Sequence, residues 1–352
     1  MENWESYVRK VVPYVPGEQP QAERMIKLNT NENPYPPAPG VQRALAGFNP
    51  DTLRLYPEPT CKVLVDAIAS YYGLGSDQVF VGVGSDDVLA MIFLTFFNSG
   101  KPVFFPDITY SFYDVWANML RIPFETKALD DDFQIKKEDY YGENGGVVFP
   151  NPNAPTGILM PLSEIEDIIA HNRDVIVVVD EAYIDFGGES ALPLIEKYDN
   201  LLVVQTFSKS RSLAGMRLGF AMGNEKLIRY INDVKYSFNS YTLNQTALVL
   251  GVQAIRDREY FEETCAKVIA TREWTKCELK KLGFSFGDSM SNFIFATHER
   301  VPAKEIFEVL REHNIFVRYF SKPRISNYLR ISIGTQQEME RLTAFLAVFL
   351  GE

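Results

Sequence analysis

The sequence predicts an α/β protein: a large domain with a mostly parallel sheet sandwiched by helices, followed by a smaller α+β domain. Short apolar runs alternate with helical stretches through most of the chain, and these runs are continuous in Val, Ile and Phe, as strands buried on both faces of a parallel sheet are. The length of 352 residues suits two domains of about 150 residues each. A more charged pattern begins near residue 250. We therefore expect an N-terminal arm over residues 1–30, a large domain over 31–248 and a small domain over 249–352.

The N-terminal segment is rich in proline, and we expect an extended arm with little regular structure there. Proline removes a backbone donor and restricts the residue that precedes it. The prolines are Pro13, Pro16, Pro20, Pro34, Pro36, Pro37 and Pro39. Helical spacing of apolar residues then appears over residues 60–72, and Gly73 and Gly75 follow. This stretch predicts a first helix that stops at the glycines.

Strand-like runs dominate the middle of the chain, and each is short and apolar. They are VFVGVG (79–84), KPVFFP (101–106), GGVVFP (145–150), VIVVVDEAY (175–183) and LLVVQTFSKS (201–210). In the C-terminal part, a charged helix through Arg272 and Leu282 leads to strand-like SNFIFAT, helical AKEIFEVLREHN and strand-like YLRISIG. This order is typical of a small α+β domain.

Composition excludes several classes of function. Acidic residues number 46 and basic residues 35, which gives a net charge of −11, and no Lys/Arg-rich run is present to bind a nucleic acid. The N-terminus has no apolar core of a signal peptide, and no stretch of about 18 apolar residues occurs, so neither secretion nor a membrane span is predicted. The three cysteines and three histidines are scattered. A cytoplasmic protein with reduced thiols and no metal site is expected.

Polar residues follow two neighbouring runs, at the point where each strand should end. Asp180 and Tyr183 end one run, and Thr206, Ser208 and Lys209 end the next. Ligands of parallel α/β sheets bind outside the carboxyl ends of the strands, so these side chains are candidates for one site. A lysine amine can act as a nucleophile toward an aldehyde, and a buried carboxylate can keep a pyridine nitrogen protonated. A structural ion pair between Lys209 and Asp180 fits these two residues equally well.

The segment SKSRSLAGMRLGF (208–220) closely resembles the lysine segment of the pyridoxal-phosphate-dependent aminotransferases of fold type I, in particular their histidinol-phosphate branch. The resemblance implies the fold of the type I transferases and a Schiff base between Lys209 and pyridoxal 5′-phosphate. It also implies that Arg217, eight positions after the lysine, binds the cofactor phosphate together with Thr206 and Ser208. A guanidinium group suits phosphate oxygens because its donors form a rigid fork.

Further segments extend the resemblance over nearly the whole chain. KLNTNENPYPP (27–37) is similar to an N-terminal segment of the family, and DEAY places Asp180 at the cofactor ring nitrogen and Tyr183 at its 3′-oxygen. VGVGSDD (81–87) resembles the turn whose amides, at Ser85 and Asp86 here, bind the phosphate at a helix N-terminus. PDITYSFY (106–113) implies that Tyr110 stacks on the ring, and RLYPEPT (54–60) implies a homodimer in which Tyr56 reaches the neighbouring site.

One position departs from the family pattern. The family usually has an asparagine immediately before Pro-Thr-Gly, where it donates to the 3′-oxygen, but this chain reads NPNAPTG (151–157) with Ala154 in that place. Three possibilities stay open at this point: Asn153 takes the role, a water takes it, or Tyr183 alone serves the oxygen.

The resemblance also implies the substrates. Arg330 in YLRISIG matches the arginine that receives a substrate carboxylate, and Arg318 in FVRYF and Tyr14 in VPYVPG match residues of the phosphate pocket. We therefore expect a ping-pong transfer of an amino group between L-histidinol phosphate and 2-oxoglutarate or glutamate. An aromatic or other amino acid aminotransferase of the same subgroup would keep every cofactor residue, and a threonine-phosphate decarboxylase-like enzyme is a further alternative. A cofactor-free binding protein on this fold would be expected to have lost Lys209.

Overall fold

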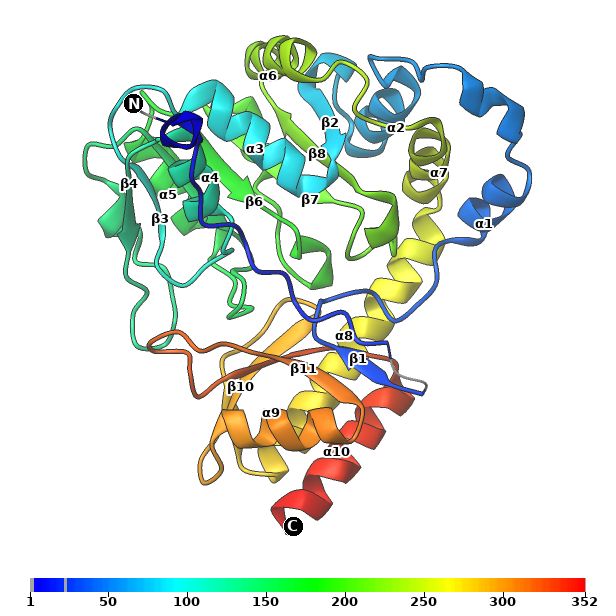
Figure 1. Cartoon of the computed structure of the whole chain (residues 1–352), viewed down its shortest axis with the longest axis vertical. Coiled ribbons are helices and arrows are strands. Elements are labelled where there is room, and N and C mark those ends of the chain that lie inside the picture. Colours follow the sequence, from blue (N-terminus) through cyan, green and yellow to red (C-terminus); the bar gives the residue numbers. More distant parts are fainter. Residues whose placement is uncertain (1–2, 22–23, 352) are drawn as a thin grey trace.

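Two β-sheets organise the chain, one in the upper and one in the lower part of Figure 1. The computed structural model describes residues 3–21 and 24–351. The larger sheet has the order β2-β8-β7-β6-β5-β3-β4 and the smaller one β1-β11-β12-β10-β9. Short 3-10 turns lie at Trp4–Tyr7, Pro50–Arg54, Ser76–Gln78, Lys137–Tyr140, Ile184–Phe186, Leu192–Glu196 and Ala214–Met216. No helix in the described part of the chain is both long and apolar enough to cross a bilayer.

The larger sheet is mostly parallel. Its strands are β2 (Val79–Val83), β3 (Val103–Pro106), β4 (Phe124–Lys127), β5 (Gly146–Pro150), β6 (Val177–Asp180), β7 (Leu201–Thr206) and β8 (Leu218–Gly223). Strand β8 runs antiparallel to its neighbours β2 and β7, and the other neighbouring strands are parallel. The five strand-like runs of the middle region are confirmed as β2, β3, β5, β6 and β7.

Helices cover both faces of this sheet, because alternate side chains of its central strands enter two separate cores. The helices of one face are α2 (Lys62–Tyr72), α5 (Leu162–His171) and α7 (Gln245–Arg256), and those of the other are α3 (Gly84–Phe96), α4 (Tyr113–Leu120) and α6 (Glu225–Phe238). On β6, for example, Val177 and Val179 face one core and Val178 the other. The predicted α/β fold of the large part is thereby confirmed.

The smaller sheet is built from the two ends of the chain. Its strands are β1 (Ile26–Leu28), β9 (Phe284–Phe286), β10 (Phe293–His298), β11 (Ile315–Tyr319) and β12 (Leu329–Ser332), and its helices are α8 (Arg258–Lys281), α9 (Ala303–Glu312) and α10 (Gln336–Leu350). Strand β1 pairs in parallel with β11, and the other pairs are antiparallel. The arm therefore contributes a strand, where little regular structure was expected.

The first predicted helix and the predicted domain boundary both differ in part from the structure. The helix predicted over 60–72 is α2, which ends before Gly73 at a φ of +72°, but it is not the first helix, since α1 (Pro39–Ala46) precedes it. Proline at the first position of a helix loses no hydrogen bond, so Pro39 starts α1 instead of preventing it. The predicted domain boundary at residue 248 falls within α7, and the division into domains stays a prediction.

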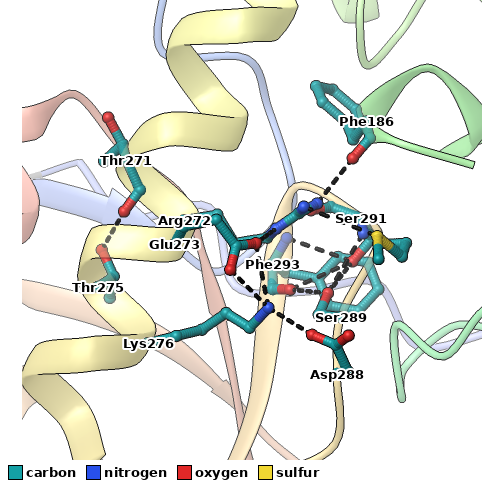
Figure 2. A network of polar contacts seen from close by, with 11 residues as sticks. Phe186, Thr271, Arg272, Glu273, Thr275, Lys276, Asp288, Ser289, Ser291 and Phe293 are labelled. Carbon is teal, nitrogen blue, oxygen red and sulfur yellow. Dashed lines mark hydrogen bonds and ion pairs between the residues drawn. The ribbon is translucent and has the colours of Figure 1, made fainter.

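Arg272 connects a turn of the larger sheet to a loop of the smaller sheet (Figure 2). This buried side chain of α8 donates to Phe186 O at 2.8 Å and to Ser291 O at 3.0 Å, and so links the turn after β6 to the loop before β10. One helical turn further on, Lys276 donates to Asp288 Oδ1 at 2.6 Å. The contacts fix α8 against both parts of the chain close to Tyr183, which begins that turn.

Candidate active site

A cavity of about 390 Å³ lies at the carboxyl ends of the central strands. Most of the residues that the sequence predicted for the cofactor line it, namely Ser85, Asp86, Tyr110, Asp180, Tyr183, Thr206, Ser208, Lys209 and Arg217. Gln19, Thr30 and Glu32 of the N-terminal segment also line it. In Figure 1 this segment descends from the larger sheet to β1 and passes between the two parts of the molecule.

Lys209 follows β7 and is held by the N-terminal segment. Its amine donates to Thr30 O at 3.3 Å and lies 5.6 Å from the centre of the Tyr183 ring. The Asn33 amide donates to the carbonyl oxygens of Lys209, at 3.0 Å, and Ser210, at 3.2 Å. Among the described residues the Lys209 amine bonds to Thr30 O and affects Asp180 only through its charge, without an ion-pair contact. The structural ion pair considered above is therefore wrong.

Asp180 ends β6 and is buried. Burial raises the pKa of its carboxyl group to about 6, although hydrogen bonds from Tyr113 Oη, at 2.9 Å, and Ala182 N, at 3.2 Å, oppose this effect. Sequence reasoning missed Tyr113. The available signal was its position three residues after Tyr110, at the start of a helix. The carboxyl group is thus fixed and shielded from water at the cavity wall.

Hydroxyls and a guanidinium group gather at the start of α3. Thr206 Oγ1 accepts from the backbone N–H of Ser208 at 3.1 Å and donates to Ser208 Oγ at 3.0 Å. A Cβ atom on Gly219 would lie 2.3 Å from Ser85 N, so glycine is needed for β8 to approach the helix start this closely. Helix N-termini with free N–H groups bind phosphate.

The Asp86 side chain engages two of the predicted cofactor residues. It accepts hydrogen bonds from Tyr110 Oη at 2.5 Å and Arg217 Nη2 at 3.0 Å. The Arg217 side chain is about half exposed, and this ion pair orients it at the start of α3. The Asp86 side chain thus links Tyr110 to Arg217, and the expected role of its backbone N–H stays a prediction.

Two predicted cofactor residues lie elsewhere. Asn153 is buried and does not line the cavity; its amide donates to Ile108 O at 3.0 Å and Thr156 Oγ1 at 3.2 Å, while Ala154 does line it. Tyr56 is 81% exposed and packs against the Tyr241 ring with centres 4.8 Å apart. In a single chain Tyr56 cannot complete the site.

The predicted substrate residues lie beside the cavity lining. Arg330 interacts electrostatically with Tyr183, Tyr14 and Tyr110, and burial lowers the pKa of its guanidinium group. Its Nη2 donates to Asn29 O at 2.9 Å, but its buried Nε has no partner in the described part of the chain. Arg318 is the register partner of Arg330 across β11 and β12. Tyr14 stacks on Phe112 at 4.1 Å, which brings the arm to the same wall.

The arrangement combines an amine, a buried carboxylate, a phosphate cradle and a pair of arginines. Such a set can bind an aromatic ring that carries a phosphate and perform amine chemistry on anionic substrates. The family described as aminotransferase class I and II matches residues 23–346, and the chain belongs to this family, whose members depend on pyridoxal phosphate. The resemblance read from the motifs is confirmed.

Individual relatives are more specific. The chain is 53% identical over 337 residues to a histidinol-phosphate aminotransferase of Clostridium botulinum, covering 96% of this chain and 95% of that one. It is 52% identical over 348 residues to the enzyme of that name from Lactococcus lactis, covering 99% and 98%. Its fold matches the histidinol-phosphate aminotransferase of Sinorhizobium meliloti in complex with pyridoxal-5′-phosphate, with a TM-score of 0.83, 23% identity and coverage of 93% and 91%.

Proposed function

We propose that this aminotransferase moves an amino group between L-histidinol phosphate and 2-oxoglutarate or glutamate, with pyridoxal 5′-phosphate as its cofactor. The family membership and the names of relatives at 52–53% identity support the reaction. A cytoplasmic location, expected from the sequence, stays a prediction.

The residues around the cavity fit the cofactor. In this proposal Asp180 would keep a proton on the ring nitrogen, Tyr183 would donate to the 3′-oxygen and Tyr110 would stack on the ring. All three residues line the cavity. The phosphate would be held by the amides at the start of α3, including Ser85, by the hydroxyls of Thr206 and Ser208, and by Arg217. Asn153 is not part of this proposal, because it does not line the cavity. When bound, pyridoxal phosphate supplies the conjugated ring that accepts electrons from the reacting carbon.

Lys209 is the proposed acid–base group. Its Nζ removes the proton from the amino-bearing carbon of the donor, and in the second half-reaction it returns a proton to the corresponding carbon of the acceptor. Thr30 O holds this amine at the cavity. Donor and acceptor use one cavity in turn, which gives a ping-pong order.

The observation that carries the choice of substrate is the register pairing of Arg318 with Arg330. Like charges directly opposite each other on neighbouring strands destabilise a sheet. Neither arginine forms an ion pair with a described carboxylate, and the buried Nε of Arg330 has no hydrogen-bond partner among the described residues. An anionic substrate group would relieve both costs. Histidinol phosphate brings a phosphate, and glutamate and 2-oxoglutarate bring two carboxylates, so donor and acceptor can use the pair in turn.

A homodimer belongs to the proposal. The face around Tyr56 exposes several large apolar side chains, namely Leu53, Leu55, Tyr56, Val63, Phe238 and Tyr241. A second copy packed on this face would cover them and bring its Tyr56 to the neighbouring phosphate cradle.

The test compares half-reactions of the cofactor-loaded enzyme with histidinol phosphate, glutamate, phenylalanine and phosphothreonine, expressed as kcat/KM. We expect histidinol phosphate and glutamate to react fastest. A preference for phenylalanine would instead establish an aromatic aminotransferase, and carbon dioxide release from phosphothreonine a decarboxylase.

A further inference from the structure

The Tyr183 hydroxyl is held by Asn31, a residue of the N-terminal segment. Asn31 Nδ2 donates to Tyr183 Oη at 3.0 Å, and both side chains are buried. The Tyr183 ring is fixed in turn by an edge contact to Phe293, with ring centres 5.0 Å apart. The position of the phenol oxygen is therefore set by residues that lie outside the cavity lining.

The orientation of the Asn31 amide is fixed by the smaller sheet. Ser332 Oγ accepts the backbone N–H of Asn31 at 2.9 Å and donates to Asn31 Oδ1 at 2.8 Å. Asn292 Nδ2 donates to Asn31 O at 3.0 Å. Because the carbonyl end of the amide faces Ser332, the NH₂ end faces Tyr183.

This orientation determines what Tyr183 can do. A phenol has one proton, and it can accept one hydrogen bond while donating another. Since Asn31 occupies Tyr183 Oη as a donor, the phenol proton is left for an acceptor in the cavity, which Tyr183 lines. Ala154 lines the same cavity and brings only a methyl group. The donor on this wall is therefore the phenol.

We propose that Asn31 is a positioning residue that fixes Tyr183 as a hydrogen-bond donor toward a ligand oxygen in the cavity. The inference rests on the proposed function for the identity of that ligand, pyridoxal phosphate. A donor stabilises an anionic oxygen and so favours the deprotonated form of the bound chromophore. Loss of the donor should raise the pH at which the visible absorption band of the loaded protein changes.

The residue type at position 31 also suits the backbone. Asn31 has a φ of +57°, a conformation that Asn, Asp and Gly adopt more easily than other residues. Asn31→Asp therefore keeps the shape and the backbone, but its carboxylate can only accept and would draw the phenol proton away from the cavity. Asn31→Gly removes the side chain and keeps the conformation. Asn314, exposed and at a φ of +58°, offers the matched control Asn314→Asp.

Charged and titratable groups around the phenol stay in place in these variants. They are Lys209, whose amine lies 5.6 Å from the ring centre, and Arg330, Tyr110 and Tyr113, which interact electrostatically with Tyr183. Asn31→Asp adds a negative charge of its own, whereas Asn31→Gly adds none. A change in the spectral titration that Asn31→Gly also shows would then come from the hydrogen bond itself.

The experiment loads wild type, Asn31→Asp, Asn31→Gly, Tyr183→Phe, the double variant N31G/Y183F and Asn314→Asp with pyridoxal phosphate, and titrates the visible band with pH. We expect N31D and Y183F each to raise the apparent pKa of the band by about one unit. The double variant should match Y183F alone, because both changes remove the same interaction. N314D should titrate as wild type does.

An unchanged pKa in loaded N31D, or a shift in N31G/Y183F equal to the sum of the N31G and Y183F shifts, would overturn the proposal. If N31D does not fold or does not bind the cofactor, the test rests on N31G. A rise in the apparent pKa of the visible band in N31G supports the proposal, and an unchanged pKa overturns it. Turnover of histidinol phosphate is measured on the same samples. Wild type that loads the cofactor but does not turn over this substrate would refute the proposed substrate and leave the spectral test of Asn31 valid. Normal spectra and turnover in N31D would refute the role of Asn31 alone.

Discussion

Arg318 lies directly opposite Arg330 in the antiparallel pair of β11 and β12. Neither side chain forms an ion pair within residues 3–21 and 24–351, and the smaller sheet thus holds two positive charges side by side at the cavity. The two guanidinium groups repel each other in the free protein. A substrate anion that binds between or beside them attracts both and so offsets this repulsion.

Replacing these arginines should separate the substrates. Arg330→Ala is expected to impair both half-reactions, whereas Arg318→Ala should impair histidinol phosphate and glutamate far more than phenylalanine, which has no distal anion. A lost charge-assisted contact of about 1.5–3 kcal/mol lowers kcat/KM roughly ten- to a hundredfold. Arg311→Ala, an exposed arginine paired with Glu18, is the control. Equal losses for all substrates in Arg318→Ala would contradict its assigned role.

Lys209→Ala should give a folded protein that holds the cofactor without a covalent bond and does not transaminate at a useful rate. The reason is that Lys209 Nζ is both the covalent partner and the proton carrier in the proposal. Stopped-flow half-reactions and the visible spectrum measure the effect, with the exposed Lys281→Ala as the control. Turnover near that of wild type would rule the assignment out.

Tyr56→Phe should weaken retention of the cofactor without unfolding the chain, since the hydroxyl is expected to reach the neighbouring subunit. Cofactor release on dilution, followed by absorbance, and mass by light scattering test this expectation. Tyr230→Phe, at a partly exposed tyrosine on α6, is the matched control. A monomer that stays fully active in dilute solution would contradict the proposed homodimer.

Asp180 makes the stability of the cofactor-free protein depend on pH. Burial raises the pKa of Asp180 from 3.8 to about 6. The contribution of its protonated carboxyl group to the unfolding free energy is therefore fully present below pH 3.8 and is lost as pH rises through 6. The unfolding free energy of Asp180→Asn, relative to wild type, should therefore increase between pH 4 and 7 by up to about 3 kcal/mol. Urea unfolding of the cofactor-free proteins measures it, with exposed Asp131→Asn as the control. A difference that stays constant with pH would contradict the raised pKa.

Arg272 should matter more for stability than its neighbour in the same network. Arg272→Met leaves two buried carbonyl groups, Phe186 O and Ser291 O, without their donor, and we expect a loss of about 3 kcal/mol or more in unfolding free energy. Lys276→Met removes contacts to the half-exposed or exposed carboxylates of Glu273 and Asp288, which should cost about 1 kcal/mol or less. Urea unfolding of both variants compares the two losses in unfolding free energy. A larger loss in Lys276→Met than in Arg272→Met would contradict this expectation about the contacts drawn in Figure 2.

The features that the sequence predicted well have local signals. The strands β6 and β7 are continuous apolar runs, and Asp180 and Lys209 follow from where those runs end. Their joint position needs only the rule that parallel strands end at the same edge. The family resemblance then supplied roles for the residues around them.

The features that it missed depend on contacts between distant parts of the chain. Tyr113 reaches Asp180 across 67 positions, and Asn31 reaches Tyr183 across 152. Strand β1 has only three residues, and its partner is near the other end of the chain, so no periodicity marks it. Asn153 was a candidate because of its place in a motif, but its amide satisfies Ile108 O and Thr156 instead.

The pairing of Ile26 with Ile315 in β1 and β11 has a consequence for synthesis on the ribosome. The segment that holds Lys209 and Tyr183 is translated early, but the sheet that anchors it is complete only after β11 and β12 have left the ribosome. Strands and helices of the larger sheet can assemble beforehand. A nascent chain that stops before β11 would then contain every cofactor-binding residue assigned to the larger sheet but lack the strand that pairs with β1. Its lysine would stay uncovered, so competence to react would follow the synthesis of β11.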